Sequence, residues 1–180
     1  MSRYELTIWS GLAGLVSGLL IIAGAVSLPF VEPVVSGTLF VTGHILLFFL
    51  LTGVYATHYS HTGLLGLLGY VLSTIGNALF VTIQTASSFV LSRIEDSVTM
   101  FPVAITVTGV LFGVGLLLFA IAITRVHAQS AWPGWLMFGG MALNLVFPRL
   151  VGEAPDIVFA IPPILLGLGV AGFGRGLRRN

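Results

Sequence analysis

Long apolar runs separated by short polar segments are the dominant pattern of this 180-residue chain. Each run has about the 20 residues that an α-helix needs to cross a bilayer. None alternates apolar and polar residues as a barrel strand does, and open strands in lipid leave backbone groups unpaired. The pattern predicts an all-α, polytopic transmembrane helical bundle, a single integral membrane domain. Its six expected spans are residues 6–28, 35–57, 63–91, 101–124, 131–149 and 156–175.

Short connections separate these expected spans and leave no linker long enough to divide the chain into domains. Pro29 and Pro33 mark the first connection, because proline lacks the N–H that a helix interior uses. The polar tetrapeptide at 58–61 predicts the second connection. Two consecutive prolines, Pro162 and Pro163, predict a kink near the start of the sixth span.

The composition agrees with a lipid environment and excludes several classes of protein. Apolar residues make up 57% of the chain and charged residues 7%, whereas soluble domains are about 25% charged. The chain has neither cysteine nor lysine, which rules out disulfide frameworks, thiolate iron–sulfur sites, retinal Schiff bases and P-loops. The net charge of +1 offers no footprint for a nucleic acid, so we expect no nucleic-acid partner.

The arginines are distributed unequally between the two sides of the expected bundle. If the N-terminus is cytoplasmic, an even number of spans returns the C-terminus to the same side. That side would carry Arg3, Arg125, Arg175, Arg178 and Arg179, and the opposite side Arg93 and Arg149. Cytoplasmic loops are enriched in Lys and Arg. The five-to-two count therefore predicts an N-in/C-in protein of the cell inner (cytoplasmic) membrane.

Small residues recur at four-residue spacing in several expected spans. Such spacing lets two helix backbones approach closely, which is a common way to pack helices in lipid. We expect close helix packing at these positions and no ligand. The pairs are Gly14 with Gly18, Gly109 with Gly113, and Gly172 with Gly176.

Three polar side chains, His44, Asn77 and Asn144, fall at a similar depth in the expected spans. His44 lies 14 residues before His58, Asn77 14 residues after Gly63 and Asn144 14 residues after Ser130. Counted from these expected cytoplasmic ends, each offset corresponds to about 21 Å along a helix. A polar group at this depth needs a partner or a cavity and is a candidate functional residue. We therefore expect one polar layer, with His44 pointing into the bundle near Asn77 or Asn144.

The third expected span also carries a polar stripe. Its members share one face of a helix with 3.6 residues per turn and are Ser73, Asn77, Phe80, Gln84 and Ser88. Two interpretations remain open. The stripe either forms interhelical hydrogen bonds of about 0.6 kcal/mol each, or it belongs to a ligand or permeation site in which Ser73 and Gln84 join the polar layer.

The residues present limit which cofactor, metal or catalytic sites the chain can form. His44 is the only histidine at mid-depth, so it would be a single axial ligand to a haem or a chlorophyll-like pigment, or simply hydrogen-bonded. His58, His61 and His127 would lie at the cytoplasmic surface, either as a metal site or as solvated side chains. The sequence has no serine elbow, paired intramembrane carboxylates or phosphate loop, which disfavours an enzyme.

Two classes of function follow from these observations. The first is an accessory or scaffold subunit of a membrane complex, which contacts membrane lipids, other membrane subunits or a second copy of the chain. The second is a small transporter or a binder of an apolar ligand such as a lipid, quinone, pigment or haem. It would use the layer of His44, Asn77 and Asn144 and predicts a cavity there. The sequence requires no cofactor.

Overall fold

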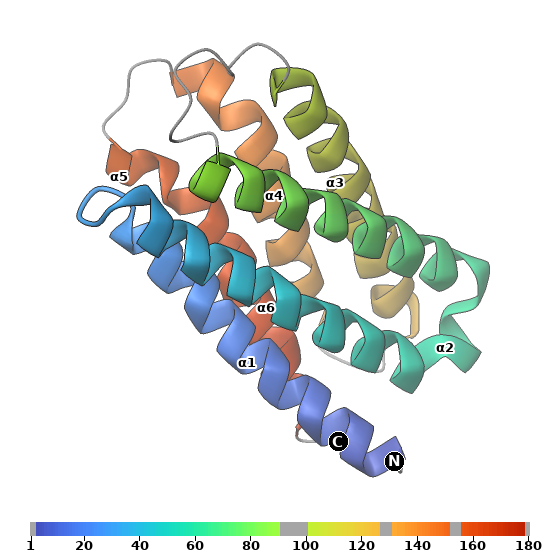
Figure 1. Cartoon of the computed structure of the whole chain (residues 1–180). Helices are drawn as coiled ribbons and strands as arrows, with labels where there is room; N and C mark the ends of the chain where they lie inside the picture. Colours follow the sequence, from blue (N-terminus) through green and yellow to red (C-terminus); the bar gives the residue numbers. More distant parts are fainter. Residues whose placement is uncertain (1–2, 91–100, 127–130, 152–155, 179–180) are drawn as a thin grey trace.

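The fold was analysed in a computed structural model, which describes residues 3–90, 101–126, 131–151 and 156–178. Helices account for nearly all of these residues, and no strand occurs among them, so the all-α prediction is confirmed for the described chain. The helices form one bundle, with both chain ends at the same end of it (Figure 1). In order they are α1 (Arg3–Ser27), α2 (Pro33–Thr85), the π-helical turn η1 (Ala86–Val90), α3 (Phe101–Val126), α4 (Trp132–Val151), α5 (Asp156–Phe159) and α6 (Ile161–Leu177).

Three of the described helices are long and apolar enough to cross a membrane. They are Tyr4–Ser27, Pro33–Phe89 and Val103–Arg125, and the apolar helix Ile161–Leu177 is shorter. The second of them has 57 residues, which would extend about 85 Å if it were straight. The hydrocarbon core of a bilayer is only about 30 Å thick, and this helix is in fact folded back on itself.

The chain reverses direction inside α2 at Gly63. The φ of 57° and ψ of −152° at this residue lie in a region that is open almost only to glycine. Residues 33–62 form the first arm of α2 and residues 64–85 the second arm, and the two arms lie side by side (Figure 1). The rings of Tyr55 and Tyr70, one from each arm, stack with their centroids 4.6 Å apart.

The expected connection at 58–61 is wrong, because this tetrapeptide is helical and the reversal comes after it. His58, expected to be at the surface, is 4% exposed, and its Nδ1 lies 2.9 Å from the Val54 carbonyl oxygen. A side chain that forms a hydrogen bond with the preceding turn of its own helix needs no partner outside that helix. A run of polar residues therefore does not mark a helix end here.

Pro162 and Pro163 interrupt the last apolar run, as the sequence predicts. The short helix α5 ends at Phe159, and both prolines lie in the first turn of α6, where the missing N–H groups would have no helical partner. The Ile164 N–H donates to the Ala160 carbonyl at 3.1 Å. The kink takes the form of a break between two helices.

Glycines allow the helices to pack backbone against backbone. A Cβ added to Gly18 of α1 would lie 2.8 Å from the Ala171 nitrogen of α6, and one added to Gly174 of α6 would lie 2.6 Å from the Gly11 carbonyl. Such distances are too short for real side chains. The expectation of close packing is thus confirmed for α1 against α6, whereas Gly113 makes only an ordinary contact at 3.7 Å.

Large apolar side chains fill the centre of the bundle. Phe112 and Phe119 of α3 and Phe173 of α6 are almost completely buried, together with Leu47 and Leu50 of α2. Burying an aromatic or leucine side chain is worth about 1.5–3 kcal/mol when the surroundings of the unfolded chain are aqueous. In lipid the same contacts contribute mainly through dispersion and close fit.

We expect Gly63→Ala to lower the free energy of unfolding by about 1–3 kcal/mol, because alanine does not adopt this backbone conformation without strain. No atom lies within 4 Å of a Cβ placed there, so the loss would come from the backbone alone. Unfolding of the detergent-purified protein would measure it. A variant as stable as the wild type would show that the reversal does not require glycine.

Candidate functional site

His44 and Asn77 form a buried pair between the two arms of α2. His44 Nδ1 lies 2.7 Å from Asn77 Oδ1, and Asn77 Nδ2 donates to the His44 carbonyl oxygen at 2.8 Å. Their side chains are 2% and 0% exposed. His44 therefore points into the bundle beside Asn77, as we expected from its depth.

Aromatic rings surround the imidazole of His44. The Phe80 ring of the second arm lies 4.4 Å away between centroids at a 38° tilt, and the Phe112 ring of α3 lies 6.1 Å away in an edge-on geometry. These rings and the Asn77 amide hold the imidazole in one orientation. An ionised group in such apolar surroundings is costly, so the geometry favours the neutral ring.

Asn144 does not belong to a hydrogen-bonded layer of three residues. It is exposed on α4, and within the described part of the chain no hydrogen bond joins it to His44 or Asn77. Its axial position is close to that of His44, since both residues line one small chamber described below. His44 and Asn77 are thus bonded to each other, with Asn144 nearby at a similar depth.

The polar stripe of the second arm faces the interior, but its members do different things. Ser73 is completely buried, and its hydroxyl donates to the Tyr70 carbonyl at 3.0 Å. It packs against α3 at Gly115 and lines none of the cavities described here. Gln84 Nε2 donates to Ser88 Oγ at 3.3 Å, and Gln84 also lines a cavity.

That cavity, here called the large cavity, has a volume of about 340 Å³. It lies in the half of the bundle away from the chain ends, between the second arm, α3, α4 and the break before α6. Its wall is mostly apolar, with four polar side chains: Gln84, Ser87, Thr108 and Asn144. The apolar lining is Leu28, Phe40, Phe80, Ile83, Ile105, Gly109, Met141, Leu145, Phe159 and Pro163.

A smaller space of about 20 Å³, the His44 chamber, adjoins the large cavity. The two share five lining residues, Phe40, Phe80, Met141, Asn144 and Pro163. The chamber is completed by His44, Gly140, Pro162 and Leu166. His44 thus lines a small space that shares part of its wall with the larger one lined by Gln84 and Ser87.

The size of the chamber decides between the ligands considered for His44. A haem or chlorophyll-like pigment needs a broad flat space directly beside the imidazole nitrogen. About 20 Å³ holds little more than one water-sized group. A macrocycle does not fit there, so the interpretation of His44 as an axial ligand does not fit this structure.

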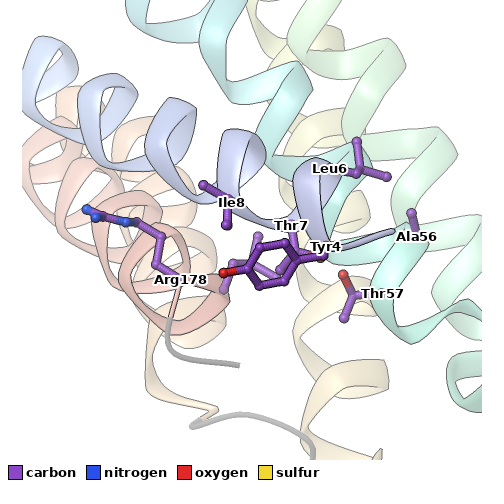
Figure 2. A pocket seen from close by; sticks show the side chains of 8 residues that line it. Tyr4, Leu6, Thr7, Ile8, Ala56, Thr57 and Arg178 are labelled. Carbon is purple, nitrogen blue, oxygen red and sulfur yellow. The ribbon is translucent and has the colours of Figure 1, made fainter. Parts of the chain in front are cut away.

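A further cavity of about 170 Å³ lies near the chain ends, between α1, the first arm and the end of α6. Figure 2 shows the Tyr4 ring in the middle of the lining side chains, with Thr57 on one side and the Arg178 side chain directed away from the ring. A Cβ on Gly11 would lie 2.7 Å from Arg178 Cγ, so the stem of this arginine packs on α1. Among the described residues that line this cavity, apolar groups and hydroxyls therefore face it, whereas the Arg178 guanidinium is directed away.

The histidines near the chain ends form no metal site among the described residues. His58 is buried and bonded to its own helix, whereas His61 is exposed. His127, the third member of the expected cluster, lies outside the described residues. Within the described ranges, no group of three His, Cys, Asp or Glu side chains is close enough to hold a metal ion.

Sequence reasoning missed most of the cavity wall. Thr108, which is 3% exposed, and Ser87 in the π-helical turn line the large cavity. Single hydroxyls in apolar spans carry little signal, because they usually bond to their own helix, as Ser87 does to the Gln84 carbonyl. The adjacent Pro162 and Pro163 were a signal, because a broken helix leaves room beside its neighbours.

Comparison with known proteins gives no further guide: no family model, no curated protein and no solved structure matches this chain.

Proposed function

We propose that this chain is a non-catalytic integral membrane protein that binds a small apolar molecule in the large cavity. The supporting observation is the cavity itself, about 340 Å³ with a mostly apolar wall and four polar side chains. Ligand sites commonly combine 300–1,000 Å³ of apolar space with a few polar groups. An apolar cavity of about 150 Å³ suffices for benzene, so this one has room for a larger molecule.

The proposal includes six membrane crossings in the cytoplasmic membrane, with both termini inside. The reversal at Gly63 gives the long helix α2 two arms and hence two crossings. Crossings by α1, α3, α4 and the segment of α5 and α6 complete the count. Arg3, Arg125, Arg175 and Arg178 belong to helix ends at the end of the bundle where the termini lie, which favours that end as cytoplasmic.

A reporter fused after Asn180 tests this orientation. We expect a fluorescent protein to be bright and a periplasmic phosphatase to be inactive at this position, because the arginine-rich side stays in the cytoplasm. Phosphatase activity at Asn180 would show that the C-terminus lies outside the cytoplasm and would contradict the proposed orientation.

Ligand binding is tested by purifying the protein in mild detergent and identifying bound small molecules by mass spectrometry. The variant Ile105→Trp should lower ligand occupancy at least fivefold, because Ile105 lines the large cavity and is 51% exposed, so the larger ring can extend into it. Val103→Trp is the matched control, since Val103 lies on the same helix, is 70% exposed and lines none of the cavities described here. Equal occupancy in both variants would contradict the proposal.

An accessory or scaffold subunit is the second candidate function. It is favoured by large apolar side chains on the outer surface, among them Trp9 at 62%, Phe30 at 76% and Trp135 at 44% exposure. Lipid alone explains such exposure in a membrane protein. The exposed side chains therefore support a scaffold function less strongly than the large cavity supports ligand binding. Other chains that co-purify in a fixed ratio, without a bound small molecule, would favour the scaffold.

A further inference from the structure

The Asn77 amide determines which nitrogen of His44 carries the proton. Asn77 Nδ2 donates to the His44 carbonyl at 2.8 Å, so Oδ1 is the amide atom that faces His44 Nδ1. The opposite amide orientation would place two oxygens against each other. Because Oδ1 only accepts hydrogen bonds, Nδ1 is the donor, and the neutral ring is the Nδ1–H tautomer.

Nε2 is therefore the lone-pair nitrogen of His44 and its remaining polar atom. No described donor is bonded to it. His44 lines the chamber, and the carbonyl-type acceptor on Nδ1 keeps the ring from turning. A lone pair held in this way is a preorganised hydrogen-bond acceptor in a mostly apolar space.

The chamber is matched to a single hydroxyl group. Its volume of about 20 Å³ admits one oxygen atom with its hydrogen. Asn144 lines the chamber as well and offers an amide that can donate. A hydroxyl oxygen could thus donate to His44 Nε2 and accept from Asn144, which neither a carbonyl nor an ether oxygen does.

We propose that the ligand of the large cavity is an apolar molecule with a terminal hydroxyl, which donates its hydrogen bond to His44 Nε2. This inference rests on the proposed function and adds the chemical class of the ligand. The apolar body occupies the large cavity, and the hydroxyl lies in the His44 chamber. An apolar molecule without a donor would leave Nε2 unpaired and would bind more weakly.

Two probes of the same length test the hydroxyl. Decanol can donate a hydrogen bond, whereas nonyl methyl ether, which has the same number of heavy atoms in its chain, only accepts one. Binding of each to the full chain in lipid nanodiscs is obtained from the dependence of the melting temperature on probe concentration. We expect decanol to bind at least tenfold more tightly than the ether, and ¹⁵N NMR of labelled histidine to show the unprotonated Nε2 resonance shifting with decanol only.

The double variant His44→Phe with Asn77→Leu removes the acceptor and its partner together, which avoids an unpaired polar group. In this variant we expect the two probes to bind within twofold of each other. Equal binding of both probes to the wild type would overturn the hydroxyl inference and leave the cavity proposal standing. Binding of neither probe would overturn both.

Discussion

Gly76→Ala is expected to lower the free energy of unfolding by about 2 kcal/mol, although it adds only one methyl group. A Cβ at Gly76 would lie 2.5 Å from the Phe112 nitrogen and 2.6 Å from its Cα. These are backbone atoms of α3, which cannot rotate aside, so the second arm and α3 must separate. Overpacked cores typically lose about 1–3 kcal/mol. Thermal and denaturant unfolding in detergent would measure the loss.

Gly139→Ala is the matched control, because Gly139 is also helical and no atom lies within 4 Å of its added Cβ. Alanine favours a helix over glycine by about 0.8–1 kcal/mol, so this variant should be as stable as the wild type or more so. The two substitutions are chemically identical and should change stability in opposite directions. A Gly76→Ala variant as stable as Gly139→Ala would contradict the close approach of the second arm to α3.

The helices were predictable from the sequence, because uninterrupted apolar runs leave few alternatives in lipid. The ends of the helices were less predictable. The polar residues at 58–61 indicated a connection, but His58 bonds to its own helix and the chain turns at Gly63. A glycine with positive φ has no sequence signature that separates it from the neighbouring Gly66, which is helical.

The sequence predicted the depth of the candidate site residues in the bundle, but not the directions in which their side chains point. Counting residues along a span gives the axial position of a side chain, which placed His44 beside Asn77 and close to Asn144. It does not give the rotation of one helix relative to its neighbours. Asn144 therefore lines a cavity wall instead of bonding to the pair, and Ser73 faces α3 instead of the cavity. The cavity itself depends on packing between helices, which no single span encodes.

Asn77→Leu is expected to lower the free energy of unfolding by about 2 kcal/mol, because it leaves the buried His44 Nδ1–H without an acceptor. Leucine has the same branching and number of side-chain heavy atoms as asparagine, so the loss reports mainly the missing hydrogen bonds. Asn144→Leu is the control. Asn144 is exposed and bonded to neither residue of the pair, and its replacement should change stability by less than about 0.5 kcal/mol.

A double-mutant cycle separates the hydrogen bond from the burial of polar groups. His44→Phe alone leaves Asn77 Oδ1 without its donor, and Asn77→Leu alone leaves His44 Nδ1–H without its acceptor, so each single variant should be destabilised. Replacing both partners by apolar groups removes the unpaired atoms and is often nearly neutral. We therefore expect the double variant to recover at least about 1 kcal/mol relative to Asn77→Leu. Strictly additive losses would mean that the two side chains do not depend on each other, which would contradict the bonded pair on which the acceptor role of His44 is built.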